Sequence, residues 1–191
     1  MLVGFHGYAE DAETQLERLS AIPESNRWLI VSIQALHRFY RGRTTLVAAS
    51  WMTRQDREAA IADNIAYVAT CIDAAAAEWP TLPIVVFAGF SQGVAMAFRA
   101  AVNAGHRVAS VIAAGGDIPP EIKPAELERV SAVLIARGKS DNWYTAEQFA
   151  MDEQRLRRCS VDVRALTLNA GHEWSNDLIA AAPQFLRDRL A

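Results

Sequence analysis

Short apolar, β-branched runs alternate with longer amphipathic stretches along nearly the whole chain. Six such runs predict strands, at residues 2–5, 28–33, 84–88, 108–113, 132–136 and 161–168. Five stretches predict helices, at residues 12–21, 55–79, 91–104, 144–159 and 176–190. The alternation is typical of an α/β fold: a compact, mostly parallel sheet of about six strands with helices on both faces.

Composition narrows the class of protein. The chain has 191 residues, of which 51% are hydrophobic and 21% are charged, so one globular domain over residues 1–191 is predicted. There are 19 basic and 22 acidic residues, for a formal net charge of -3. This balance gives no reason to expect a nucleic acid or an anionic membrane as partner, so a small-molecule partner is predicted.

The sequence also predicts a cellular compartment. Its two cysteines, Cys71 and Cys159, fall in predicted helices and are expected to be buried thiols without a disulfide framework. The first residues lack the charged and apolar regions of a signal peptide, and no apolar run approaches the roughly 18 residues of a membrane span. A soluble cytoplasmic protein is therefore predicted.

A serine between two glycines marks the end of the third predicted strand. It is Ser91, in the run "GFSQG" at residues 89–93. In a strand-turn-helix context this pattern is typical of a nucleophile elbow, a sharp turn whose crowding requires small flanking residues. The alternative is that Ser91 only caps its helix. Because ligands bind outside the carboxyl ends of parallel strands, partners for Ser91 are expected directly after other strands.

A serine hydroxyl needs a base within hydrogen-bond reach and a third group to orient that base. His172 follows the last strand and precedes the last helix, in the chain order Ser, acid, His; a loop histidine near a helix start is the alternative. Asp141 follows the fifth strand and is the predicted acid. Asp117, after the fourth strand, is its competitor, although it also fits a turn before two prolines.

The other histidines have simpler explanations. His106 lies at a predicted helix end, where a positive side chain is favourable, and His37 lies in a basic loop that is expected to be solvated. His6 is interpreted as a residue that shapes the loop "FHGYAED" after the first strand. This loop is predicted to supply one oxyanion donor, the backbone N–H of Tyr8, and the backbone N–H of Gln92 is predicted to supply the other.

Taken together, "FHGYAED", "GFSQG", "RGKSD" and "GHEWS" resemble the motifs of the phospholipase/carboxylesterase family of α/β-hydrolases, which includes the acyl-protein thioesterases. The resemblance extends over nearly the whole chain. It implies an α/β-hydrolase fold, Ser91 as nucleophile, Asp141 and His172 as triad partners, and Tyr8 and Gln92 as oxyanion donors.

The chain departs from the family pattern at three points. Ala9 and Glu10 stand where the oxyanion loop usually carries a second glycine, and Tyr144 stands where the acid motif usually continues with a small apolar residue. The chain also begins almost at its first strand, so one or two leading strands of many α/β-hydrolases are expected to be absent. These departures concern substrate shape and sheet size rather than the type of reaction.

Several features are candidates for contact with substrate. The resemblance implies that Trp51 lies near the substrate channel. Trp143 and Trp174, close to the predicted acid and base, could line an acyl pocket, or all three could be ordinary packing residues. The basic loop 37–43 could favour an anionic substrate or an acyl carrier, or could simply be solvated.

Access to the site is predicted to be open. The connection 115–131 is too short for a lid domain, and its three prolines favour a stiff rim; the loop 34–50 is the other candidate for a moving part. The sequence thus predicts a serine hydrolase that cleaves carboxylic esters or thioesters through an acyl-Ser91 intermediate, with no metal or organic cofactor. The alternatives are an acyltransferase with the same triad and a non-catalytic ligand-binding module on a hydrolase scaffold.

Overall fold

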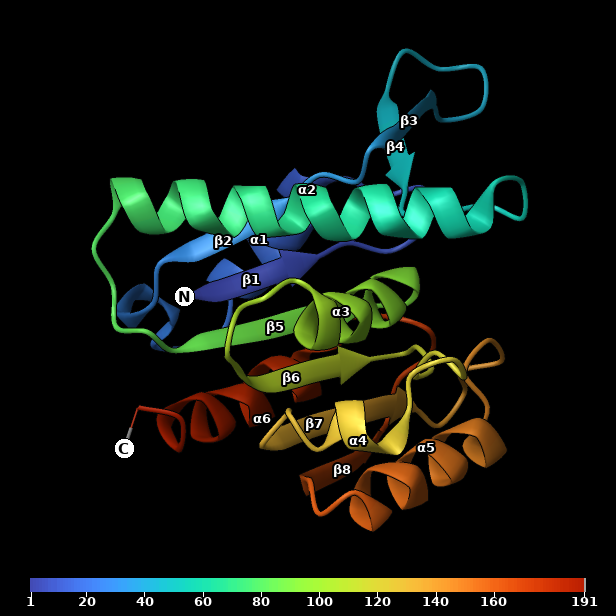
Figure 1. Cartoon of the computed structure of the whole chain (residues 1–191). Helices are drawn as coiled ribbons and strands as arrows, with labels where there is room; N and C mark the ends of the chain where they lie inside the picture. Colours follow the sequence, from blue (N-terminus) through green and yellow to red (C-terminus); the bar gives the residue numbers. More distant parts are fainter. Residues whose placement is uncertain (191) are drawn as a thin grey trace.

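The computed structural model describes residues 1–190, and its elements follow the predicted alternation (Figure 1). The first part of the chain forms β1 (Leu2–Phe5), α1 (Ala12–Ser20), a 3-10 turn (Ser25–Arg27), β2 (Ile30–Ile33), β3 (His37–Tyr40), β4 (Val47–Ser50) and α2 (Arg57–Glu78). The second part forms β5 (Val85–Phe90), α3 (Gln92–Asn103), β6 (Val108–Ala114), α4 (Pro124–Leu127), β7 (Ala132–Gly138), α5 (Ala146–Arg158), β8 (Asp162–Leu168) and α6 (Asn176–Arg187).

Six strands form one sheet in the order β2-β1-β5-β6-β7-β8, and every neighbouring pair is parallel. All six predicted segments are strands of this sheet, so the predicted α/β architecture is confirmed. The register aligns the carboxyl ends, with Phe5 opposite Gly89 and Phe90 opposite Ala114. The strand order reverses between β1 and β5, which is the position where open parallel sheets bind ligands.

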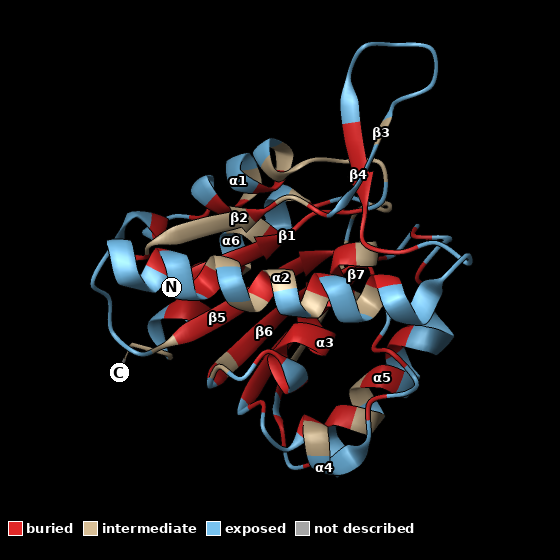
Figure 2. Cartoon of the chain, turned by 45° about the horizontal axis from the view of Figure 1, so that its top comes forward, coloured by how far each residue is buried: buried red, intermediate tan, exposed pale blue. Residues whose placement is uncertain are grey.

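Helices cover both faces of the sheet, as predicted (Figure 1). Helices α2, α3 and α5 pack on one face, and α1 and α6 pack on the other. In β5, Phe87 points into the first core while Val86 and Ala88 point into the second, because successive side chains of a strand point to opposite faces. Figure 2 shows β5 as buried along its length. Burial of a side chain such as Phe87 contributes about 1.5–3 kcal/mol.

A hairpin projects from this layered body (Figure 1). Strands β3 and β4 pair antiparallel, with His37 opposite Ser50 and Tyr40 opposite Val47. The prediction of a simple solvated loop at residues 37–43 is therefore wrong for residues 37–40, although most of β3 is exposed. Strand β3 could not be predicted from the hydrophobic pattern because it has no continuous apolar face. Its pairing with β4 and the packing of the Phe39 ring on the Tyr8 ring, with centroids 5.8 Å apart, hold it in place.

The long helix α2 corrects one expectation. Among the helices of residues 1–190 it alone is long and apolar enough, by length and composition, to cross a membrane, whereas no such segment was expected. Its apolar character comes largely from alanines, and it lies along the sheet with the stripe Ala60, Asn64, Val68, Ile72 and Ala75 buried. Both cysteines are free thiols; Cys159 is buried as predicted, but Cys71 on α2 is only half-buried.

Candidate active site

Ser91 occupies a sharp turn between β5 and α3. Its φ of 51° and ψ of -119° lie outside the regions that a non-glycine residue prefers, at a cost of about 1–3 kcal/mol. A Cβ at Gly89 would clash with the Gly93 backbone, and one at Gly93 would clash with the Phe5 carbonyl oxygen. The flanking glycines are therefore required by the close approach of β1 and α3 to this turn.

The hydroxyl of Ser91 faces a histidine and does not cap the helix. No capping hydrogen bond forms from its side chain within the described chain, so the capping alternative for Ser91 is not supported. Instead Ser91 Oγ lies 2.9 Å from His172 Nε2, and His172 Nδ1 lies 2.8 Å from Asp141 Oδ2. The structure thus brings three predicted site residues from three separate loops into one hydrogen-bonded row.

The loops after β7 and β8 place the acid and the base. Gly138, which ends β7, pairs with Leu168, which ends β8. A Cβ at Gly138 would clash with the carbonyl oxygens of Ala170 and Gly171, so the two loops can pack together only because residue 138 is a glycine. His172 follows directly, with 23% of its side chain exposed, while the Asp141 side chain is 1% exposed. The base is reachable from solvent and the acid is not.

Asp141 is held as a carboxylate. Its Oδ1 accepts the backbone N–H groups of Trp143 at 2.8 Å and Tyr144 at 3.0 Å, while Oδ2 accepts from His172. Burial opposes ionisation, but the hydrogen bonds from Tyr144, His172 and Trp143 outweigh it and lower the pKa of Asp141 below its ordinary value. An ionised Asp141 requires the hydrogen of neutral His172 on Nδ1, which leaves Nε2 free to accept from Ser91.

The competing acid lies elsewhere. Asp117 is exposed, and in residues 1–190 it makes no hydrogen bond or ion pair with His172. The structure therefore places Asp141, rather than Asp117, beside the histidine.

The two predicted oxyanion donors make no hydrogen bond within residues 1–190. The backbone N–H of Tyr8 and that of Gln92 donate to no other described group. The Gln92 side chain clamps the chain opposite: its Oε1 accepts from Trp51 N–H at 2.9 Å, and its Nε2 donates to the Met52 carbonyl at 2.9 Å. Both donors are thus available at the sheet edge where Ser91 lies.

The first loop compensates for its missing second glycine. Ala9 adopts a glycine-like φ of 58°, and its N–H donates to the Ala49 carbonyl at 3.0 Å. Glu10 accepts the Gly7 N–H at 2.8 Å and forms a two-point ion pair with Arg18, at 2.6 and 2.7 Å. The sequence marks Glu10 only as a departure from the family pattern, and its ion pair with Arg18 was not predicted, because Arg18 lies on α1.

His6 shapes the same loop, as predicted. It is fully buried; its Nδ1–H donates to the Gly7 carbonyl at 2.7 Å, and its Nε2 accepts the Ala35 N–H at 3.1 Å. Burial is the main cause that lowers the pKa of His6, so it stays neutral and fixed in this bridging position.

The tryptophans require a correction. Trp51 is fully buried and donates from Nε1 to the His6 carbonyl at 2.8 Å, so it supports the loop and has no surface for a substrate channel. Trp174 is also a core residue, packed with β5 and α6. Trp143 differs from both: it is 81% exposed, and its ring centre lies 6.4 Å from that of His172. Burial therefore supports the packing alternative for Trp51 and Trp174, and of these three tryptophans Trp143 is the exposed one.

Two further residues fix the turn that carries the acid. The buried Tyr144 hydroxyl donates to Asp152 Oδ2 at 2.9 Å, and the Ile118 N–H donates to the same oxygen at 3.2 Å. Arg137 donates to the carbonyls of Tyr144 and Asp141, at 3.2 and 3.3 Å. Burial raises the pKa of Asp152, so this carboxyl depends on the donors around it. Tyr144 thus replaces the family's small apolar residue as part of a polar anchor.

Removing the Tyr144 hydroxyl should weaken this anchor. Tyr144→Phe is expected to lower the free energy of unfolding by about 1–3 kcal/mol, because the buried Asp152 carboxyl loses a donor. Urea denaturation at neutral pH measures the effect. Tyr40→Phe, which removes an exposed hydroxyl from the hairpin, is the matched control and should change the stability by less than about 0.5 kcal/mol. Equal stability of the two variants would contradict the anchoring role of Tyr144.

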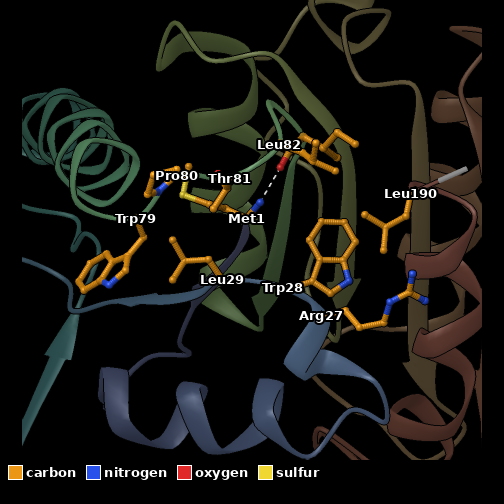
Figure 3. Close-up of a pocket in the computed structure, with 10 residues that line it drawn as sticks. Met1, Arg27, Trp28, Leu29, Trp79, Pro80, Thr81, Leu82 and Leu190 are labelled. Atoms are coloured by element: carbon orange, nitrogen blue, oxygen red, sulfur yellow. Dashed lines mark hydrogen bonds between the residues drawn. The ribbon is translucent and has the colours of Figure 1, made fainter.

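A cavity of about 320 Å³ lies away from this row (Figure 3). It is lined by residues at the amino ends of strands, including Met1 before β1, Leu29 before β2 and Ile84 before β5. Ser91, Asp141 and His172 instead follow the carboxyl ends of their strands. The cavity in Figure 3 is therefore separate from the candidate site.

The parallel sheet and the serine turn after β5 define an α/β-hydrolase fold. The chain belongs to the phospholipase/carboxylesterase family, whose model matches residues 4–190. No curated protein sequence matches the chain. Family membership supports ester hydrolysis in general.

Solved structures of similar fold include enzymes from plants and bacteria. SOBER1 from Arabidopsis thaliana is 16% identical, with a TM-score of 0.79, and the match covers 100% of this chain and 98% of that one. A carboxylesterase from Mesorhizobium loti is 19% identical, with a TM-score of 0.79 and coverage of 97% and 87%. A Bacillus cereus carboxylesterase is 15% identical, with a TM-score of 0.75 and coverage of 99% and 88%. These likenesses establish the fold.

Proposed function

We propose that this protein is a serine hydrolase that cleaves small carboxylic esters or thioesters through an acyl-Ser91 intermediate. The observation that carries the proposal is the hydrogen-bonded row of Ser91, His172 and Asp141 at the carboxyl edge of the sheet, with Ser91 in an elbow turn. This arrangement has each part that nucleophilic acyl transfer requires: a nucleophile, a base that faces it and an acid that orients the base.

The proposed reaction has two halves. In the first, His172 Nε2 takes the proton of Ser91 Oγ as the oxygen attacks the carbonyl carbon, and the N–H groups of Tyr8 and Gln92 stabilise the oxyanion. The imidazolium then gives that proton to the leaving alcohol or thiol, which leaves Ser91 acylated. In the second half His172 activates a water, which attacks the acyl group and releases the acid. Asp141 stays ionised throughout and stabilises the imidazolium.

Covalent labelling tests the nucleophile directly. A fluorophosphonate should label wild-type protein at Ser91, whereas Ser91→Ala protein should stay unlabelled, because the reagent needs an activated hydroxyl. Unlabelled wild-type protein would favour the ligand-binding alternative. Product analysis in the presence of a competing alcohol separates hydrolysis from acyl transfer, since an acyltransferase would form the new ester in preference to the free acid.

The connection between β6 and β7 forms the rim beside the proposed site, and its rigidity indicates whether the site opens to soluble esters without a lid movement. Arg155 on α5 donates to the carbonyls of Ile118, Pro119 and Ile122, and it thereby ties down the connection that follows β6. The helix α4 in this connection has only 4 residues. Such a short, proline-containing segment supports a fixed rim rather than a moving lid.

A fixed rim predicts that the enzyme is active on dissolved esters without a lipid–water interface. The rate on soluble short-chain esters, acetate to octanoate, is expected to rise hyperbolically with substrate, with no jump at the micellar concentration. Titration of released acid across that concentration is the measurement, and a lipase that requires an interface is the control. An abrupt rise in rate on adding detergent micelles or an emulsion would contradict the fixed rim and would point to the hairpin β3–β4 as a moving part.

A further inference from the structure

A second cavity, of about 310 Å³, lies beside the serine turn. Its walls come from three segments: the connection from β4 to α2 together with the first residue of α2, the first turns of α3, and the connection after β6. Three arginines contribute to it, Arg54 and Arg57 from the first segment and Arg99 from the second. This volume is at the lower end of the range for small-molecule sites, about 300–1,000 Å³.

The cavity adjoins the proposed catalytic residues. One wall contains Gln92, which directly follows Ser91 and whose side chain holds the Met52 carbonyl of the opposite wall at 2.9 Å. Another wall contains Asp117, which follows Gly115 and Gly116. A Cβ at Gly116 would clash with the Ser91 carbonyl oxygen, so this wall packs directly on the serine turn. A group bound in the cavity would therefore belong to a molecule whose ester lies near Ser91.

The arginines differ in how their charge is balanced. Arg99 is buried and forms an ion pair with Glu121 at 2.5 Å, so its charge is already compensated. Arg54 and Arg57 are exposed, and within residues 1–190 neither side chain forms a hydrogen bond or an ion pair. With Glu121 and Asp117 counted, the cavity keeps an excess of one positive charge.

The position of Arg57 has no explanation from the helix itself. Arg57 is the first residue of the 22-residue helix α2, where the positive end of the helix dipole disfavours a cation. The preceding residue, Asp56, provides no side-chain cap for this end within the described chain. Asp56 and Glu58 flank Arg57 in the chain, but neither lines the cavity. The guanidinium groups of Arg54 and Arg57 and the N-terminus of α2 therefore give the cavity wall a positive potential, an arrangement that attracts anions.

We propose that this cavity binds a carboxylate carried by the ester substrate, with Arg54 and Arg57 as its partners. This inference rests on the proposed function and names its substrate class: small esters that bear one negative charge. A single carboxylate matches the excess of one positive charge better than a phosphate, which carries a charge of about -1.5 to -2. The planar guanidinium also matches the two oxygens of a carboxylate.

Two pairs of esters test whether a carboxylate on the substrate raises the rate and on which side of the ester it must lie. On the acyl side, monoethyl adipate is compared with ethyl hexanoate; on the alcohol side, 4-acetoxybutanoate is compared with butyl acetate. The readout is the ratio of kcat/KM for the charged ester to that for its neutral partner. Arg54→Gln and Arg57→Gln are each expected to lower this ratio about tenfold in at least one pair, because each removes one charge-assisted contact. The pair that responds identifies the side of the ester that carries the carboxylate.

The matched control is Arg158→Gln. Arg158 is also exposed and forms no ion pair within residues 1–190, but it lies on α5 away from this cavity, so its variant should keep the wild-type ratio. Salt at about 1 M should lower the wild-type ratio, because it screens exposed charges. A ratio that stays unchanged in the double variant Arg54→Gln/Arg57→Gln, in both pairs, would overturn the carboxylate site while leaving Ser91-dependent hydrolysis intact.

Measuring the binding of the charged esters tests the carboxylate site independently of the proposed hydrolysis. Ser91→Ala protein should bind monoethyl adipate or 4-acetoxybutanoate, as measured by calorimetry, and should lose about tenfold in affinity when Arg57→Gln is added. If wild-type protein hydrolyses none of the four esters but this arginine-dependent binding persists, the hydrolase proposal fails and the carboxylate site stands. Binding that is insensitive to both arginines would overturn the site whatever the activity.

Discussion

Ester hydrolysis should fall by about 10⁴–10⁶-fold in Ser91→Ala and in His172→Ala, because a nucleophile and its base act as one unit. Ser91 Oγ and His172 Nε2 lie 2.9 Å apart, so removal of either group leaves the other without a function in the proposed attack. Both residues lie at the sheet edge and are partly exposed, so the fold should be retained. The measurement is turnover of p-nitrophenyl butyrate, with circular dichroism to check folding.

The double variant sharpens this test. Ser91→Ala/His172→Ala should be no less active than either single variant, since the two losses are not additive within one unit. His106→Ala is the matched control: His106 lies at the amino edge of the sheet, 3.5 Å from Asp73, and its loss should leave the rate within about twofold. Retention of more than about 1% of the wild-type rate in either single variant would contradict the assignment of the pair.

The sheet was predictable because its strands are buried on both faces. A strand such as β5, "VVFAGF", then reads as a continuous apolar run, and its separation from the next run by a helical stretch favours parallel pairing. The hairpin β3–β4 was not predictable in the same way. Residues 37–40 include His37, Arg38 and Tyr40, all exposed, so their strand conformation comes from pairing with β4.

The proposed site was predictable where it depends on strand ends. Ser91, Asp141 and His172 each follow a predicted strand, and parallel strands bring their carboxyl ends to one edge. The turn glycines Gly89 and Gly93 gave the most specific local signal, because close backbone approach excludes any larger residue there.

The supporting residues were not predictable, because their roles depend on contacts between distant elements. Asp152 on α5 accepts from Ile118, 34 residues away, and nothing in the helical pattern of α5 indicates that contact. Trp51, by contrast, was named as a candidate but is a core residue. A tryptophan can line a channel or fill a core, and only its burial in the fold decides between them. Arg54 and Arg57 belong to no motif in the sequence, and only the fold brings them to one cavity.

Asp141→Asn should cost about 10⁴-fold in rate, the size of the corresponding loss in a serine protease triad. The reason lies in the contacts of the carboxylate. Its Oδ1 accepts two backbone N–H groups, so the single oxygen of an asparagine is needed there and its NH₂ group must face His172 Nδ1. Nδ1 then becomes the acceptor, and the imidazole hydrogen moves to Nε2, where it points at Ser91 and blocks proton removal.

The competing acid provides the matched variant. Asp117→Asn makes the same chemical change at an exposed carboxylate without a hydrogen bond to His172, so its rate on neutral esters should fall by less than about tenfold. Turnover of p-nitrophenyl butyrate and the rate of fluorophosphonate labelling are measured for both variants, since the labelling rate reports activation of Ser91 without the hydrolytic step. A large loss in Asp117→Asn together with near-normal labelling of Asp141→Asn would show that Asp117, and not Asp141, orients the base.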